Sequence, residues 1–194
     1  GNGIFRSVDG GMTWSVLQTD QPVERLATAD FLSLSEGIVG GARECLATVV
    51  ADQAVVMNEP RRSLRELRGA SLDDKSVGWI VGDGASILMT EDAGVTWRVP
   101  AGSLPDGFTN LVDLRSVTHR DAITMAAGSP GSFALRSDDY GASWKIVAMP
   151  ANGLIHRIRL GSETNAFAVG SFGQILRSAN RGLSWECVRS ANKR

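Results

Sequence analysis

The fold is decided by the stretch Val77 to Trp97, which reads VGWIVGDGASILMTEDAGVTW. An apolar run, Val77 to Val81, ends at a Gly-Asp-Gly turn, and a second short apolar run, Ile87 to Met89, follows it. The pattern Thr-x-Asp-x-Gly-x-Thr-Trp then closes the stretch. Short apolar runs bounded by Gly and Asp are typical of β-strands joined by turns. The stretch therefore predicts strand, tight turn, strand, ordered loop and the start of another strand.

The closing pattern recurs in one register along the chain. Asp or Asn can fold the loop by bonding its own backbone, Gly supplies a positive φ, and Trp gives the next strand a large apolar anchor. We therefore predict a structural role for all copies. They are Ser7, Asp9, Gly11 and Trp14; Thr90, Asp92, Gly94 and Trp97; Ser137, Asp139, Gly141 and Trp144; and Ser178, Asn180, Gly182 and Trp185.

This pattern resembles the Asp-box, or bacterial neuraminidase repeat, which joins the third and fourth strands of a β-propeller blade. Boxes of this kind occur in sialidases, xyloglucan-active glycosidases, sortilin-type receptors and photosystem II stability/assembly factors. The extended form here, from Gly78-Trp79 to Ile87-Leu88, is most similar to the last of these, and Ala168 to Leu176 repeats it. The resemblance implies an all-β propeller of four-stranded antiparallel blades. It also implies an extracytoplasmic location, the periplasm or thylakoid lumen, although no signal peptide is visible.

The spacing of the boxes gives the domain organisation. With a degenerate copy at residues 57–64, boxes recur about every 43 residues, the size of one blade. We expect one domain, residues 1–194, with a partial blade at 1–20 and blades at about 21–67, 66–100, 108–149 and 152–190. In the second unit, Cys45 to Val50 is expected as an inserted run before a third strand at Ala54 to Met57.

The predicted strands amount to four whole blades and the outer two strands of another, which is not a whole number of blades. An open ring would leave strand edges unpaired, so a propeller has to close. Two interpretations stay open. The sequence is an excerpt of a larger propeller, or it is a compact five-bladed ring whose first blade is incomplete or filled by a partner.

Bulk properties exclude several classes of function. The 194 residues carry 20 basic and 21 acidic side chains, a formal net charge of −1, so no global field favours nucleic acid. No apolar run approaches the roughly 18 residues that a membrane-spanning helix needs. The two cysteines, Cys45 and Cys187, show no metal-ligand spacing and are expected to be buried free thiols.

The residues that a sialidase needs are missing. Such enzymes are similar to one another in an Arg triad, an Arg-Ile-Pro segment and a Tyr nucleophile. Here the one Tyr, Tyr140, lies inside a box, and the nearest segment, Ile4-Phe5-Arg6-Ser7, lacks the Pro. We therefore assign no catalytic residue and predict that the chain is not an enzyme.

A glycosidase that uses two carboxylates is the alternative reading, because paired Asp or Glu need only face each other across a cleft. Solvated loop charge also explains each candidate. His119 and His156 are too few for a metal site or an acid/base pair, so no metal or cofactor is predicted. Trp79, outside the boxes, is expected to pack between blades. The loose carboxylate candidates are Asp73, Asp74, Asp83, Asp106 and Asp113.

The innermost strand of each complete blade is expected to carry an Arg. These residues are Arg25, Arg68, Arg115 and Arg157. Innermost strands line the channel of a propeller, so the repeated Arg would form a positive ring or patch suited to carboxylate-bearing peptides. The other explanation is that they are ordinary polar positions alternating with apolar ones. The assembly-factor family is similar in having a basic patch that engages a photosystem subunit.

These observations favour a non-enzymatic propeller scaffold that binds a protein client. The client would be a membrane-protein subunit or an acidic or C-terminal peptide. The alternative class is a glycan-active propeller, either a sialidase-like or xyloglucanase-like glycosidase or a lectin-like sugar binder. It needs convergent carboxylates or exposed aromatic residues at the channel.

Overall fold

The chain is built almost entirely of β-strands, which confirms the predicted all-β class. The computed structural model describes residues 3–20, 22–23, 25–51, 53–56, 65–73, 76–106, 108, 112–161 and 164–189. Within these ranges the chain forms eighteen strands and two single-turn 3-10 helices, η1 (Asp83–Ala85) and η2 (Ser171–Gly173). The strands form five sheets, which we number in chain order.

The five sheets take their strands mostly in sequence order. The first sheet pairs β1 (Phe5–Arg6) with β2 (Ser15–Val16). The second contains β4 (Leu26–Ser33), β5 (Glu36–Gly41), β6 (Leu46–Val50) and β7 (Gln53–Val56), with β3 (Gln18–Thr19) added parallel to β7. The third contains β8 (Leu67–Leu72), β9 (Gly78–Gly82) and β10 (Ile87–Thr90). The fourth contains β11 (Asp113–Arg120), β12 (Ile123–Ser129), β13 (Phe133–Ser137) and β14 (Lys145–Ala148), and the fifth β15 (Ile155–Leu160), β16 (Ala166–Gly170), β17 (Ile175–Ser178) and β18 (Glu186–Arg189).

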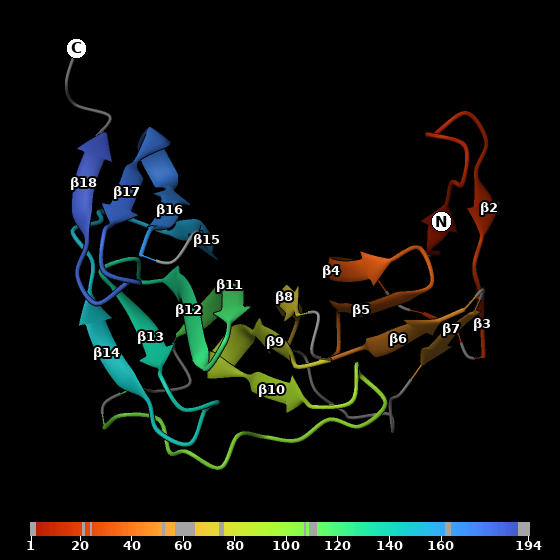
Figure 1. Ribbon diagram of the computed structural model, residues 1–194, viewed down its shortest axis with the longest axis horizontal. Coiled ribbons are helices and arrows are strands. Elements are labelled where there is room, and N and C mark those ends of the chain that lie inside the picture. The colour runs from red at the N-terminus through yellow and green to blue at the C-terminus, as the bar shows by residue number, and fades with distance from the viewer. Residues whose placement is uncertain are drawn as a thin grey trace.

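The sheets follow one another along an arc (Figure 1). The first strands of the larger sheets, β4, β8, β11 and β15, line the inside of the arc and contact one another in that order. The last strands, such as β14 and β18, lie on the outside. Side chains on the first strands are therefore brought together from segments more than 40 residues apart.

Apolar side chains fill the space between neighbouring sheets. Met125 and Ala127 of the fourth sheet pack against Ile155, Ile158 and Leu176 of the fifth, and all five are almost completely buried. Each sheet therefore buries one face against the preceding sheet, and the alternation of apolar and polar residues along its strands records which face that is.

Trp79 packs between the third and fourth sheets, as the sequence predicts. The side chain is fully buried, and its ring meets Trp144 edge-on with 5.7 Å between the ring centroids. A Cβ added at Gly141 would also press on the Trp79 ring, so this box Gly is required both for its positive φ and for close packing.

An irregularity recurs near the start of each first strand. The register of β8 with β9 skips Arg68, and the register of β11 with β12 skips Arg115. A Cβ at Gly82 or Gly128, which lie opposite these bulges, would collide with the carbonyl oxygen of Glu66 or Asp113. The recurrent Gly therefore permits the bulge, and bulges of this kind re-aim a side chain.

The second sheet differs from the prediction. Cys45 to Val50 is not an insertion: β6 covers most of it and is the third strand, while β7 is the fourth. Val50 pairs with Gln53, so these two strands follow each other too closely in sequence to hold a box between them. The predicted third strand at Ala54 to Met57 is therefore the fourth strand, and the predicted degenerate box at residues 57–64 lies outside the described residues.

The third sheet is also shorter than expected. After β10 and its box, the outer strand is reduced to one antiparallel bridge between Met89 and Arg98. Pro100 follows two residues later and is buried. A Pro cannot donate to a ladder, so it is consistent with the early end of this strand.

Candidate functional site

The boxes use their polar side chains within the loop. Asp92 accepts hydrogen bonds from the Thr96 hydroxyl at 2.6 Å and the Thr96 backbone N–H at 2.8 Å. Thr90 donates its hydroxyl to Asp92 at 2.7 Å and accepts from the Gly94 N–H at 2.9 Å. The boxes at Asp9 and Asp139 repeat this pattern. These carboxylates staple the turn and leave little of their charge for a ligand.

The same hydrogen bonds lower the pKa values of the box carboxylates. The Thr13 hydroxyl, followed by the Thr13 backbone N–H and the Ser7 hydroxyl, lowers the pKa of Asp9 to about 2. The pKa of Asp92 is lowered chiefly by the Thr96 hydroxyl. The pKa of Asp139 is lowered by the Ser143 hydroxyl in the same way. All three are therefore anionic at neutral pH.

The box Trp residues are not equivalent anchors. Trp144 is 7% exposed, whereas Trp14 is 63% exposed. Trp97 and Trp185 lie between these extremes. The Trp predicted to be a large apolar anchor is therefore mostly exposed in the first box, because the described chain places little apolar surface over the Trp14 ring.

The register separates the four predicted Arg. Arg68 and Arg115 occupy the same bulge, immediately after Leu67 and Leu114, which pair with Gly82 and Gly128. The corresponding positions in the second and fifth sheets hold Ala27 and His156. Arg25 lies two residues before its bulge, at the position of Glu66 and Asp113. Arg157 lies one residue after its bulge and pairs with Val169.

Arg25 and Arg68 converge on one carboxylate. Arg25 donates to both oxygens of Glu66, at 2.8 and 2.9 Å. Arg68 also reaches Glu66, at 2.8 Å, and forms a two-pronged pair with Asp83, whose oxygens lie 2.5 and 3.1 Å from its Nε and Nη2. Glu66 is largely buried, so removal of its Arg partners would cost more stability than the loss of a fully exposed pair, although the Arg25 side chain is itself 73% exposed. They join the second sheet to the third near the starts of β4 and β8.

Arg115 extends this cluster into the fourth sheet. Asp113 accepts a hydrogen bond from the backbone N–H of Gly84 at 3.2 Å. Burial would raise the pKa of Asp83, but hydrogen bonds from Arg68 and the Glu66 N–H and the charges of Arg68 and Arg115 lower it overall. The Nε of Arg115 is buried and makes no hydrogen bond within the described part of the chain. Arg115 therefore lies near the carboxylates without being held by them.

We name this cluster the mouth cluster: Arg25, Glu66, Arg68, Asp83, Asp113 and Arg115. Sequence reasoning missed Glu66 and the role of Asp113. The segments Glu-Leu-Arg at 66–68 and Asp-Leu-Arg at 113–115 carry the signal, because a repeated acid two residues before an Arg suggests that the two lie close together. The mouth cluster therefore contains both carboxylates and guanidinium groups and is not a ring of Arg alone.

The other carboxylate candidates have structural partners or lie apart. Asp73 accepts the Val77 N–H at 2.8 Å and approaches the buried His119 ring at 3.4 Å. Asp106 is exposed, and Asp74 lies outside the described residues. Among the described residues, no group of three or more His, Cys, Asp or Glu is placed to hold a metal ion.

The two cysteines and His156 differ in their burial and lie in different surroundings. Cys45 is a buried free thiol, as expected, but Cys187 is exposed, so the prediction of burial is wrong there. Its strand, β18, is the exposed last strand of the fifth sheet. His156 is exposed and lies 3.5 Å from the Ser171 hydroxyl.

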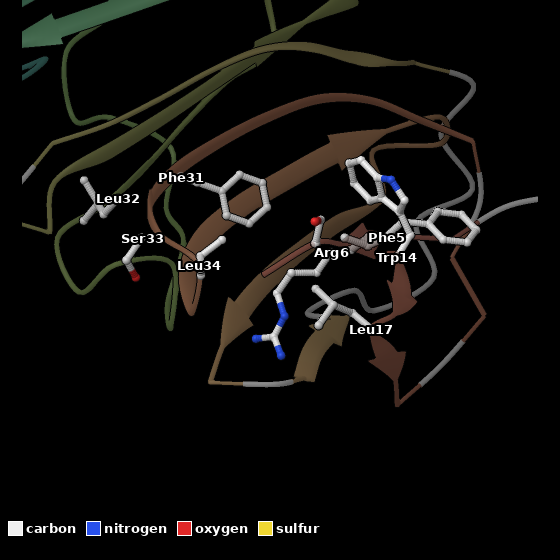
Figure 2. Close-up of a pocket in the computed structure, with 10 residues that line it drawn as sticks. Phe5, Arg6, Trp14, Leu17, Phe31, Leu32, Ser33 and Leu34 are labelled. Atoms are coloured by element: carbon white, nitrogen blue, oxygen red, sulfur yellow. The ribbon is translucent and has the colours of Figure 1, made fainter. Parts of the chain in front are cut away.

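An apolar groove lies between the first sheet and the turn that joins β4 to β5. Its volume is about 400 Å³. Figure 2 shows Phe31 and Leu34 on one side and Phe5, Trp14 and Leu17 on the other. The groove carries Arg6 but no carboxylate, so it offers apolar contact and not acid/base chemistry.

Within the ranges given above, the structure contains no helix with the length and apolar character needed to span a membrane.

Comparisons with known proteins place the chain in a family. A family model described as photosynthesis system II assembly factor YCF48 matches residues 64–192. The photosystem II assembly lipoprotein Ycf48 of Prochlorococcus marinus (strain MIT 9313) is 27% identical over 187 residues, which cover 90% of this chain and 53% of that protein. The chain thus spans about half the length of this curated relative.

Two solved structures show the same fold. A structure titled YCF48 bound to D1 peptide is 24% identical, with a TM-score of 0.55, covering 64% of this chain and 42% of that one. An ancestral GH74 enzyme is 11% identical, with a TM-score of 0.71, covering 96% of this chain and 28% of that one. Likeness at this identity concerns the fold alone, so the GH74 structure does not favour the glycosidase reading.

The two kinds of comparison agree on the architecture that the boxes predict, the β-propeller. Because the family model matches more than half of the residues, the chain belongs to the photosynthesis system II assembly factor YCF48 family.

Proposed function

We propose that this chain is a non-enzymatic propeller scaffold that binds a protein client during photosystem II assembly. The family and the name of the Prochlorococcus relative support the assembly role. A YCF48 structure is described as bound to D1 peptide, and we extend peptide binding of this kind to the present chain. The relative is named a lipoprotein, which supports an extracytoplasmic site of action.

One observation carries the choice of binding site. Arg115 lies in the same strand bulge as Arg68, but its buried Nε makes no hydrogen bond within the described residues. Arg68, in contrast, is held by Glu66 and Asp83. A carboxylate of a client could pair with Arg115 without displacing an existing partner. At Arg68 it would have to compete with two carboxylates already in place.

The mixed charge of the mouth cluster indicates which kind of client would bind there. Three Arg stand beside three carboxylates, so long-range attraction of acidic molecules is weak. Specificity therefore depends on contact at short range, where a two-pronged Arg–carboxylate pair gives both energy and orientation. We infer that the client presents a carboxylate, at a chain terminus or an acidic side chain, to Arg115.

The test is peptide binding measured by fluorescence anisotropy. The probes are a labelled peptide from the C-terminal segment of a photosystem II D1 subunit and the same peptide with an amidated C-terminus. Arg115→Gln should weaken binding of the free-carboxylate peptide by about tenfold or more, the range expected for a lost charge pair. Arg98→Gln removes an exposed Arg of the third sheet and serves as the matched control.

Variants at three of the four predicted Arg have separate expected outcomes in this experiment. Arg68→Gln should lower the melting temperature, because Glu66 and Asp83 lose a partner. Arg115→Gln should lower it less, because it removes only a charge near Asp83 and no hydrogen bond of the described residues. Arg157→Gln tests the remaining candidate, for which the described residues show no link to the mouth cluster. Equal peptide affinity in wild type and Arg115→Gln would contradict the proposed site, and no binding of either peptide would contradict the proposed client.

A further inference from the structure

The fourth sheet carries a polar pair where the other large sheets carry an apolar one. His119 of β11 pairs with Thr124 of β12. In the other sheets, a large apolar residue at the equivalent position of the first strand pairs with Gly or Ala. These pairs are Phe31 with Gly37, Leu72 with Gly78, and Leu160 with Ala166. The change to His and Thr puts a titratable ring in a place that apolar packing fills elsewhere.

Both members of the polar pair are buried. The His119 side chain and Thr124 are completely buried. The ring Nδ1 lies 2.8 Å from the Thr124 hydroxyl oxygen, which is hydrogen-bond distance. A buried polar group costs free energy unless it is hydrogen-bonded. The Thr124 hydroxyl therefore satisfies one nitrogen of the ring.

The other nitrogen of the ring faces the third sheet. Nε2 lies 3.4 Å from Oδ2 of Asp73, whose side chain is 13% exposed. The second carboxylate oxygen of Asp73 accepts a hydrogen bond from the Val77 N–H at 2.8 Å, so the turn after β8 holds Asp73 beside the ring. Because His119 belongs to β11, this contact crosses between the third and fourth sheets. We name Asp73, His119 and Thr124 the junction cluster.

The backbone of His119 is tied to the third sheet as well. Its N–H donates to the Ser71 hydroxyl at 3.1 Å. The His119 ring also lies against Trp79 of β9, with 5.9 Å between the ring centroids. The ring therefore has little room to turn away, and a change in its charge acts directly on the contact between the two sheets.

Protonation changes the strength of the contact with Asp73. A neutral imidazole has one N–H and one acceptor nitrogen, whereas the imidazolium has an N–H on each nitrogen. A neutral ring with its proton on Nε2 can contact both Thr124 and Asp73. Only the imidazolium adds the attraction between opposite charges, which makes such a hydrogen bond stronger. The protonated ring is therefore expected to hold Asp73 more tightly than the neutral ring does.

Two effects oppose a positive charge on the ring. Burial disfavours any charged group, and nearby Arg residues repel a cation. These Arg are exposed, so water and salt screen them, whereas Asp73 acts on the ring at ion-pair distance and largely shielded from water. The other titratable and charged groups that line the adjoining pocket or lie against the ring are Arg120, Asp121, Tyr140 and Arg159, and Asp121 pairs with Arg181 at 3.6 Å.

We propose that the junction cluster is a pH-sensitive lock between the third and fourth sheets. A proton from solvent binds the His119 ring, which then donates to Asp73 of the third sheet and to Thr124 of its own sheet. Solvent reaches the cluster through a polar pocket of about 420 Å³ that Asp73 and His119 help to line. β11 also carries Arg115, so the lock holds the strand that presents part of the mouth cluster. The proposal does not depend on client binding.

The first test is the titration of the ring itself, followed by NMR. The chain has two His, so His156→Gln leaves His119 as the single source of imidazole signals. We expect these signals to titrate between about pH 8 and pH 5. Asp73→Asn in this background should lower the midpoint by about one pH unit or more, because the carboxylate that favours the imidazolium is gone. Asp121→Asn removes an exposed carboxylate of the same pocket as a matched control and should move the midpoint less.

The second test measures stability against pH. His119→Leu combined with Thr124→Ala installs the pair found in the fifth sheet. Urea unfolding at about pH 8 and pH 5.5 gives free energies above the range in which the box carboxylates titrate. A His that binds its proton more tightly when folded stabilises the fold below its unfolded pKa, about 6.5, and this contribution is lost as the pH rises through the folded value. Wild type should therefore gain stability relative to the double variant at pH 5.5.

Three outcomes would overturn the proposal. One is a ring that keeps a single protonation state between pH 8 and pH 5. Another is an equal shift of the midpoint in Asp73→Asn and Asp121→Asn, since only the net charge of the pocket would then matter. The third is a wild type that gains no stability relative to the double variant on acidification. If the double variant does not fold, the two Asn variants still decide, because they keep the pair of His119 with Thr124.

Discussion

Asp92 and Asp139 show how a single carboxylate is used up by hydrogen bonds within its own loop. Each accepts two hydrogen bonds from one hydroxyl residue four positions on, so the carboxylate closes the loop that contains it. Asn180 shows that the geometry survives without the charge. Its amide oxygen accepts from the Ser184 N–H at 2.9 Å, and its amide nitrogen donates to the Ser184 hydroxyl at 2.8 Å.

The lowered pKa values predict a pH dependence of stability. A carboxylate whose pKa is lower in the folded than in the unfolded state stabilises the fold above the unfolded value, about 3.9. That contribution is lost as the pH falls toward the folded value, which for Asp9 is about 2. We expect thermal melting temperatures to drop below pH 4, and the drop to be smaller in Asp92→Asn, which copies the Asn180 box. An unchanged profile would contradict this role of Asp92.

The box Trp residues should differ in their effect on stability. Trp144→Ala removes a buried ring that meets Trp79 edge-on, and we expect a loss of about 3–5 kcal/mol in the free energy of unfolding. Trp14→Ala removes an exposed ring and should cost less than about 1 kcal/mol. Urea unfolding of both variants would measure the difference. Equal losses would show that exposure of the ring does not decide its contribution.

Strand bulges decide which side chains meet at the scale of the elements. The sequence predicts that the first strands carry Arg, because apolar alternation marks the strands and their order follows the boxes. It does not reveal that Arg68 and Arg115 share a bulge while Arg157 falls one position further on, since a bulge changes the facing of every later residue. The second sheet has no box between its third and fourth strands, so the sequence pattern does not mark where its third strand ends. Val50 of the third strand pairs directly with Gln53 of the fourth, so no room is left for the loop by which third strands are recognised.

The bulges depend on the glycines opposite them. Gly128→Ala would place a Cβ against the carbonyl oxygen of Asp113, and backbone on both sides leaves no flexible group to move. We expect a loss of about 1–3 kcal/mol in the free energy of unfolding, together with weaker peptide binding, because Arg115 would be displaced. Gly3→Ala, whose Cβ would make ordinary contacts, is the control. A Gly128→Ala protein with wild-type stability and binding would contradict this explanation of the recurrent Gly.

Across the whole molecule, the contacts between neighbouring sheets are harder to predict from the sequence than the sheets themselves. Apolar clusters and Trp79 could be anticipated, because buried faces alternate with polar ones along each strand. The pairs of Glu66 with Arg25 and Arg68 could not, because they join segments that are adjacent only after the second and third sheets have packed. The exchange of Ser116 and Thr118 for Arg157 and Arg159 at the equivalent positions of β15 is likewise visible only after the registers are aligned.

The parallel pairing of β3 with β7 has a consequence for aggregation. Gln18 and Thr19 cover the outer edge of the second sheet, where Gln53 and Ala54 would otherwise present free backbone groups. In the fourth and fifth sheets, β14 and β18 are the last strands and carry charged side chains such as Lys145, Glu186 and Arg189. Charge on an exposed edge discourages another chain from adding to it. The molecule thus protects its outer edges by two means: a short strand laid over one sheet and ionised side chains on two others.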